Sequence, residues 1–240
     1  MNPTHKTYFN WSSGKDAALA FYHLQQDPTY QIDRLITTVN AHYQRVSMHG
    51  LPIQLLNRQA AAIGLPLSTI QLPEQPTMER YEQILGDTLR ELQQQGYTHS
   101  GFGDIFLEDL RQYRENQLQD YGMIGTFPLW KRDTKALVRE LVDLGFKAVI
   151  ICLKSDLLDV SFLGRAIDQQ LIDDLPANVD PCGENGEFHT FCYDGPIFQA
   201  PIAFTFGERV FREYEAPKEN NEQTTTLEKY GFWFLDLIPT

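Results

Sequence analysis

One short stretch near the start of the chain joins an apolar strand pattern to a helix through a small polar turn. Residues 8–17 read Tyr-Phe-Asn-Trp-Ser-Ser-Gly-Lys-Asp-Ala, and apolar residues at positions 17, 20, 21 and 24 then recur at helical spacing. A helix that begins at the end of a strand presents free backbone N–H groups, which suit an anion. The hydroxyls of Ser12 and Ser13 and a mobile cation on Lys15 would suit a phosphate, although ordinary helix capping also favours Ser, Gly and Asp here.

The same strand-then-helix pattern repeats through the first half of the chain. Further strands are expected at 35–39, 65–72, 97–103, 123–127 and 146–153, and the helices between them end at Gly64, Gly96, Gly122 and Gly145. Such alternation implies a parallel sheet with right-handed crossovers, and ligands bind at the carboxyl ends of its strands. The polar turns 12–16, 40–50 and 101–104 would therefore line one crevice.

After about residue 153 the pattern changes. Residues 155–175 look helical and mixed, 180–187 form a polar loop, and β-type alternation covers 202–206, 208–214 and 230–237, with a mobile hairpin loop expected at 216–226. We therefore expect an α/β fold of two parts. Residues 1–130 form a nucleotide-binding domain with a Rossmann-like parallel sheet flanked by helices, and residues 131–240 form a smaller α+β subdomain on the substrate side.

Composition narrows the class of protein. Hydrophobic residues make up 42% of the 240, which is typical of a soluble globular chain. The longest apolar run, residues 148–153, is too short to span a bilayer, and the polar N-terminus shows no signal peptide. Three scattered cysteines favour a reducing, cytoplasmic setting. A net charge of −12 argues against a broad nucleic-acid surface but allows a nucleotide pocket.

Four further polar groups are candidates for the site, each with a purely structural alternative. His49 would contact a nucleotide or simply begin a helix, and Asp104 would bind Mg²⁺, act as an acid or base, or cap a helix. Residues 128–133 combine Trp130 with two cations and would contact a substrate or turn the chain. Residues 183–190 read Gly-Glu-Asn-Gly-Glu-Phe-His-Thr and would orient ammonia, take up a proton or bind Mg²⁺, or form an acidic turn.

The first loop resembles the pyrophosphatase loop of the adenine-nucleotide α-hydrolase superfamily, Ser-Gly-Gly-x-Asp-Ser. Ser13 stands in place of a glycine and Ala17 in place of the final serine. With residues 37–39, 47–50, 103–105, 111–115, 128–133, 183–190 and 194–196, the loop resembles the diphthine–ammonia ligase (diphthamide synthetase) family of ATP pyrophosphatases. The resemblance covers the chain from near its N-terminus to about residue 198 and implies an adenine-nucleotide α-hydrolase-like fold.

The resemblance also implies a reaction and its cofactors. ATP activates a carboxylate as an acyl-adenylate and releases pyrophosphate, and ammonia then displaces AMP to give an amide. The implied phosphate cradle is Ser12, Ser13, Gly14, Lys15 and Asp16. The implied contacts to the rest of the nucleotide are Thr38, Met48, His49 and Gly103. The implied catalytic set is Lys15, Asp16, Asp104, Glu184 and Glu187, with Mg²⁺ on Asp16 and Asp104. The implied substrate contacts are Trp130, Arg132, Asn185 and His189.

Several alternatives stay open at this stage. The family's acceptor is diphthine, a modified histidine on translation elongation factor 2, and the sequence does not show that this chain shares it. Another ATP pyrophosphatase, such as a tRNA-modifying enzyme, fits the same fold, although the net charge of −12 weighs against tRNA. The altered loop also leaves room for an ATP-binding protein without catalysis. A homodimer is neither indicated nor excluded.

Overall fold

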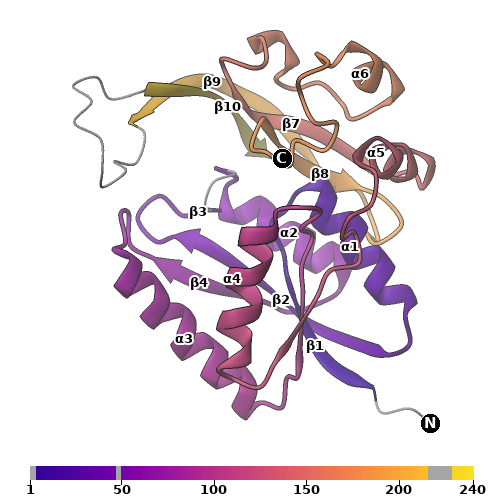
Figure 1. The fold of residues 1–240 in the computed structure, drawn as a ribbon. Coiled ribbons are helices and arrows are strands. Elements are labelled where there is room, and N and C mark those ends of the chain that lie inside the picture. The colour runs from indigo at the N-terminus through magenta and orange to yellow at the C-terminus, as the bar shows by residue number, and fades with distance from the viewer. Residues whose placement is uncertain (1–3, 47–49, 216–228) are drawn as a thin grey trace.

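The computed structural model describes residues 4–46, 50–215 and 229–240, and two sheets dominate it (Figure 1). Sheet A contains β1 (His5–Asn10), β2 (Tyr30–Asn40), β3 (Arg45–Val46), β4 (Leu67–Leu72), β5 (His99–Gly101) and β6 (Ile124–Thr126). Its strands follow the order β3-β2-β1-β5-β6, with β4 also paired to β2. The pairs β1–β2, β1–β5, β2–β4 and β5–β6 are parallel, which confirms the α/β fold expected from the alternation.

Helices cover both faces of sheet A. One face packs against α3 (Met78–Gln94) and α4 (Glu108–Gln119) through a cluster that includes Tyr8 and Ile36. The other face packs against α1 (Lys15–Gln26) and α2 (Ile53–Ile63) through Phe9 and Leu35. Adjacent residues of one strand thus enter different cores, because successive side chains of a strand point to opposite faces. The layer of α1 and α2 also faces sheet B.

Sheet B is antiparallel and closes over the α1–α2 layer (Figure 1). It contains β7 (Lys147–Lys154), β8 (Phe188–Asp194), β9 (Phe204–Glu215) and β10 (Lys229–Pro239), in the order β8-β7-β10-β9. The helix α5 (Thr134–Asp143) leads into it from sheet A, and Asp133 caps this helix by accepting a hydrogen bond from the Ala136 N–H at 2.7 Å. The short helices η1 (Val160–Phe162) and α6 (Gln169–Asp174) join β7 to β8.

The structure corrects three details of the expected pattern. The strand predicted at 146–153 forms, but as β7 it belongs to antiparallel sheet B and not to the parallel sheet. The polar segment 40–50 includes a two-residue strand, β3, that pairs antiparallel with the end of β2. Residues 155–175, expected to be helical and mixed, hold only the two short helices. The loop expected at 216–226 lies outside the described residues. Among the helices that the structure does describe, none has the length and apolar character needed to span a membrane.

Candidate functional site

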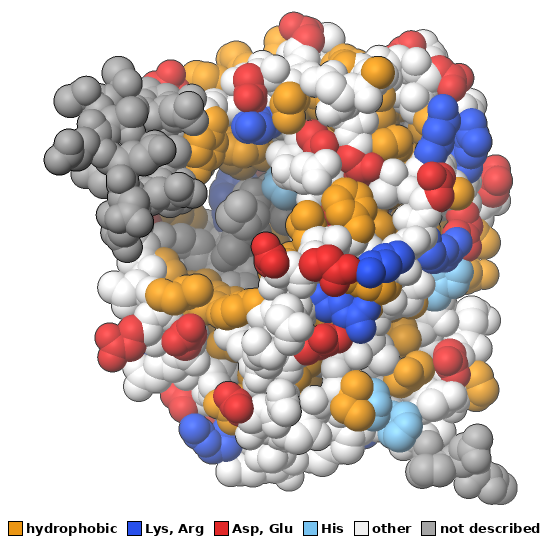
Figure 2. Space-filling model, in the orientation of Figure 1, with side chains coloured by type: hydrophobic (Ala, Val, Ile, Leu, Met, Phe, Trp, Pro, Cys, Tyr) orange, Lys and Arg blue, Asp and Glu red, His pale blue; other side chains and the backbone are white. Residues whose placement is uncertain are grey.

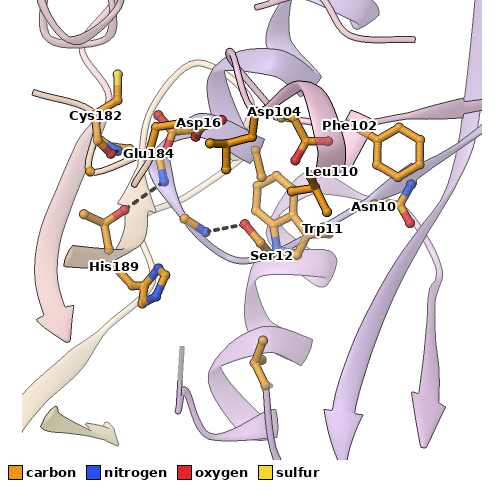
Figure 3. A pocket seen from close by; sticks show the side chains of 18 of the residues that line it. Asn10, Trp11, Ser12, Asp16, Phe102, Asp104, Leu110, Cys182, Glu184 and His189 are labelled. Carbon is orange, nitrogen blue, oxygen red and sulfur yellow. Dashed lines mark hydrogen bonds and ion pairs between the residues drawn. The ribbon is translucent and has the colours of Figure 1, made fainter. Parts of the chain in front are cut away.

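A pocket of about 400 Å³ opens where the carboxyl ends of the sheet A strands meet sheet B (Figure 3). Figure 2 shows the molecule hollowed on this face, with hydrophobic and acidic side chains at the rim. The predicted residues that line it are Ser12, Gly14, Lys15, Asp16, Thr38, Gly103, Asp104, Glu184 and His189. The polar turns after β1 and β5 therefore meet in one crevice, as the strand–helix alternation predicted. From the β2 side the described lining residues are Ile36, Thr37 and Thr38 of the strand itself and Val46 of the segment 40–50.

The loop between β1 and α1 adopts an unusual backbone conformation. Ser13 has φ +75°, in the left-handed region where glycine is favoured, at the position where it replaces the glycine of the pyrophosphatase loop. Its carbonyl accepts hydrogen bonds from the Cys192 N–H at 2.9 Å and from the Gln59 side chain at 3.0 Å. The serine therefore keeps the backbone turn that a glycine would provide, and contacts from β8 and α2 hold it there.

Lys15 is not the mobile cation expected from the sequence, because its side chain is only 2% exposed. Its ammonium donates to the Asp16 carboxylate at 2.7 Å and to the Cys182 carbonyl, and it lies 5.2 Å from the centre of the Phe188 ring. Burial alone lowers the pKa of Lys15, but Asp16, Cys182 and Glu184 together outweigh it, so the pKa is raised overall. Lys15 therefore contributes a fixed positive charge beneath the pocket and ties α1 to the 180–187 loop.

Three carboxyl groups, those of Asp16, Asp104 and Glu184, line this pocket, and the first two affect the protonation of Glu184. Glu184 accepts a hydrogen bond from the Ile105 N–H at 2.7 Å and comes from the loop before β8 (Figure 3). Burial, with a smaller contribution from the nearby Asp16 and Asp104 carboxylates, raises the pKa of Glu184 to about 7 against the opposing effect of the backbone hydrogen bonds. Glu184 therefore titrates near neutral pH, in the range that suits a proton acceptor or donor.

Asp104 is held by an arginine on α4. Arg114 Nη2 donates to Asp104 Oδ1 at 3.1 Å, and Arg114 Nε lies 2.8 Å from Oδ2 as an ion pair whose angle does not make a hydrogen bond. The guanidinium also lies 4.6 Å from the centre of the Phe102 ring. Burial raises the pKa of Asp104 and the arginine counteracts this. The structure places Arg114, on α4, in the pocket lining.

His189 and Gly103 shape the two sides of the pocket. Burial lowers the pKa of His189 to about 4, with a further contribution from the charge of Lys15, so its imidazole is neutral at pH 7. A Cβ on Gly103 would lie 2.9 Å from the Ala17 backbone nitrogen. The absence of a side chain at this position therefore lets the end of β5 approach the start of α1.

Several predicted residues do not line the pocket. Glu187 is 2% exposed and accepts hydrogen bonds from the Asp180 N–H at 3.0 Å and from the Asn185 N–H at 2.9 Å, so it shapes the loop that carries Glu184. Asn185 is exposed and donates its side-chain amide to Glu187. Ser13 is buried beneath the lining. Met48 and His49 lie outside the described residues.

Trp130 and Arg132 also lie away from the pocket lining. The Arg111 guanidinium lies 4.6 Å from the centre of the Trp130 ring. Arg132 pairs with Glu140 on α5 and contacts His23 at 3.2 Å near the end of α1. These contacts hold residues 128–133, which connect the two sheets, against the neighbouring helices. They agree with the alternative that this segment serves to turn the chain.

The pocket lining includes groups that could bind a nucleotide and a divalent cation. Within residues 4–46, 50–215 and 229–240, no group of three or more His, Cys, Asp and Glu side chains is arranged to hold a metal ion. Mg²⁺ commonly binds through one or two carboxylates plus substrate phosphates, and Asp16 and Asp104 are two carboxylates of the lining that could hold one beside a bound triphosphate. The start of α1 supplies the backbone N–H groups that suit an anion.

Comparisons with known proteins give a consistent family. The model of the diphthamide synthase N-terminal domain matches residues 5–124, and the model of the C-terminal domain matches residues 133–220. The Homo sapiens protein named diphthine–ammonia ligase is 28% identical over 189 residues, covering 72% of this chain and 69% of its own length. The Danio rerio protein of the same name is 26% identical over 178 residues, covering 68% and 70%.

Proposed function

Because the chain belongs to the diphthamide synthase family, we propose that it is an ATP-dependent ligase that joins ammonia to a carboxylate as an amide. The observation that carries the proposal is one pocket lined by both the anion-binding loop after β1 and the carboxyl group of Glu184. The loop side would bind the nucleotide. The Glu184 side would receive ammonia.

The proposed reaction has two steps. The acceptor carboxylate oxygen attacks the α-phosphorus of ATP, which breaks the bond to the β-phosphate and releases pyrophosphate. The nitrogen of ammonia then attacks the acyl carbon, and AMP leaves with the bonding electrons. Mg²⁺ on Asp16 and Asp104 would offset the charge of the phosphates. The protein's own task is to hold both substrates at the strand ends and to manage the proton that the attacking nitrogen loses.

The nucleotide side of the pocket is assigned to the start of α1. Ser12, Gly14 and Asp16 line it and would contact the β- and γ-phosphates. Lys15 would act from below, since its buried ammonium adds positive potential without reaching into solvent. Thr38, at the end of β2, would lie beside adenosine. Met48 and His49 keep the same proposed role, which the described residues do not address.

The acceptor side is assigned to Glu184, with the neighbouring loop in support. Its carboxyl group has a pKa of about 7 and lies beside Asp16 and Asp104, so as a carboxylate it would attract ammonium and accept a proton from it. His189 lines the same side as a neutral imidazole. Glu187 and Asn185 would act through the shape of the loop. Trp130 and Arg132 would influence the acceptor only from outside the pocket lining.

The acceptor we propose is the carboxylate of diphthine, since the relatives are named diphthine–ammonia ligase. The test mixes the protein with Mg-ATP, an ammonium salt and a translation elongation factor that carries this modified histidine. The expected products are AMP, pyrophosphate and an amidated histidine, seen by chromatography and mass spectrometry. Release of ADP and phosphate, or nucleotide binding without any amide, would contradict the proposal.

A matched pair of variants assigns the role of Glu184. Glu184→Gln removes the titrating carboxyl group and is expected to keep Mg-ATP binding while slowing amide formation at least about a hundredfold, the lower end of what a positioned proton acceptor typically contributes. Glu108→Gln is the control, because Glu108 is also a glutamate near this loop but is 64% exposed and pairs with Lys131 on the surface. The control is expected to match the native rate. Equal slowing in both variants would contradict the role of Glu184.

A further inference from the structure

A buried glutamine on α2 connects three segments that meet beneath the pocket. Gln59 is fully buried, and its Oε1 accepts a hydrogen bond from the Trp11 indole N–H at 2.9 Å. Its Nε2 donates to the Ser13 carbonyl at 3.0 Å and to the Cys192 carbonyl at 2.6 Å. The indole offers only a donor and the two carbonyls only acceptors, so the partners themselves fix the orientation of the amide.

One of these bonds holds a residue with an unfavourable backbone conformation. Ser13 has φ +75°, and its carbonyl is held both by Gln59 and by the Cys192 N–H. Lys15, two residues further on, is held from the same strand, β8, since the Lys15 N–H donates to Thr190 Oγ1 at 3.0 Å. The direction of the N–H groups at the start of α1 therefore depends on contacts from α2 and β8 as well as on the loop sequence.

We propose that Gln59 is a positioning residue for the phosphate loop, which holds Ser13 in the left-handed conformation and so directs the start of α1 toward the nucleotide. Gln59 is not part of the pocket lining, so it acts through Ser13 and Trp11. The expected effect of Gln59 on nucleotide binding rests on the proposed function. The expected effect of Gln59 on the loop conformation does not.

The variant Gln59→Met tests the proposal, because methionine has a similar length and no hydrogen-bonding amide. The control is Gln54→Met, the same exchange at an exposed position of the same helix. Calorimetric titration with Mg-ATP is expected to show affinity at least about tenfold weaker for Gln59→Met and unchanged for Gln54→Met. In the complete reaction, KM for ATP should rise more than kcat falls. A Gln59→Met protein that is folded and binds Mg-ATP like the native one would overturn the proposal.

A second-site change separates positioning from plain stabilisation. Glycine adopts a positive φ without the steric cost of serine, so Ser13→Gly added to Gln59→Met is expected to recover most of the lost Mg-ATP affinity. The comparison is made at a temperature where both variants are fully folded, so that a difference in stability alone does not change the affinity. If Gln59 only stabilises the fold, Ser13→Gly would then leave the affinity of Gln59→Met unrecovered. That result would overturn the proposal even if Gln59→Met lowers the melting temperature.

Hydrogen exchange supplies a readout that needs no nucleotide. The Cys192 N–H, bonded to the Ser13 carbonyl, is expected to exchange faster in Gln59→Met than in Gln54→Met, and Ser13→Gly should restore its protection. Unchanged exchange in Gln59→Met would overturn the proposal. If the native protein binds no Mg-ATP, the proposed ligase function is contradicted. If the variants nevertheless show the predicted exchange pattern, the assignment of Gln59 to the loop is still supported.

Discussion

Ser13 combines two unfavourable features in one buried residue. Its φ of +75° costs an L-residue about 1–2 kcal/mol, and its buried Oγ has no hydrogen-bond partner among the described residues. Ser13→Gly removes both and is expected to raise the free energy of unfolding by about 1 kcal/mol, after the greater freedom of glycine in the unfolded chain is counted.

Urea denaturation of Ser13→Gly beside native protein measures this change. Ser12→Gly is the comparison, because Ser12 lies in the same loop but is absent from the positive-φ residues. That substitution is expected to lower stability, since it removes the hydroxyl that accepts from the Gly14 N–H at 3.4 Å and gains nothing from backbone relief. A Ser13→Gly protein less stable than the native one would show that the left-handed conformation is not strained.

Glu184 is expected to make stability depend on pH. Its pKa rises from 4.5 to about 7 on folding, so the folded protein keeps a proton that the unfolded chain releases. The associated stability is complete below pH 4.5 and is lost as pH rises through about 7. The fall in the free energy of unfolding between about pH 5 and about pH 8 should therefore be smaller in Glu184→Gln than in native protein. Identical falls in both proteins would show that Glu184 titrates normally.

Residue chemistry explains which parts of the site the sequence predicts. Asp16, Asp104 and Glu184 are polar residues in turns between apolar strands and helices, where charged side chains stand out. Gln59 does not stand out, because it follows the spacing of an amphipathic helix and its partner Cys192 lies 133 residues away. In the sequence Arg114 resembles an ordinary surface cation, and only the fold places it beside Asp104. The sequence pattern carries no signal for either contact.

At the scale of elements, the close contact between β5 and α1 depends on Gly103. Ala17 N, Ala17 Cα and the Asp16 carbonyl carbon would lie 2.9–3.1 Å from a Cβ there, and all three are backbone atoms that cannot rotate away. Gly103→Ala should therefore push the start of α1 away from β5 and cost about 1–3 kcal/mol, typical of overpacking.

The measurement compares Gly103→Ala with Gly122→Ala in unfolding and in Mg-ATP binding. Gly122 ends the turn after α4, and a Cβ there meets no atom within 4 Å, so its substitution reports only the backbone cost of φ +63°. Weaker Mg-ATP binding is expected for Gly103→Ala alone. Equal binding in the two variants would show that the start of α1 tolerates the added methyl group.

The elements also show the limit of pattern analysis. The sequence predicts the existence of β7 correctly but suggests the wrong sheet, because its buried run follows a helix just as a parallel strand would. A strand buried on both faces reads as continuously apolar in either kind of sheet, so periodicity cannot distinguish them. Helix ends were easier to predict, since Gly64 ends α2 with φ +82° at the position where glycine favours a left-handed cap.

At the scale of the whole molecule, the two sheets share one core. The same buried cluster contains Phe9 of sheet A, Trp11 in the loop after β1, Phe21 of α1, and Phe191 and Cys192 of sheet B. The loop after β1 adds polar links, since the Ser13 carbonyl accepts from the Cys192 N–H at 2.9 Å. The division into residues 1–130 and 131–240 remains a prediction, and the shared core argues that the two parts depend on each other for stability.

The full chain is therefore expected to unfold in one cooperative transition. The free energy gained from apolar burial is roughly proportional to the area removed from water. Separating the sheets would expose the α1–α2 layer and leave neither part with a complete core, so the two parts should unfold together. Urea unfolding followed by tryptophan fluorescence should coincide with unfolding followed by far-UV circular dichroism. The Trp11 signal, isolated by Trp130→Phe and Trp233→Phe, should share that midpoint, because Trp11 contacts both Phe9 and Phe198. A fragment of residues 1–130 should lack the transition. Two separate midpoints, or a cooperatively folded fragment, would show that the sheets are stable independently.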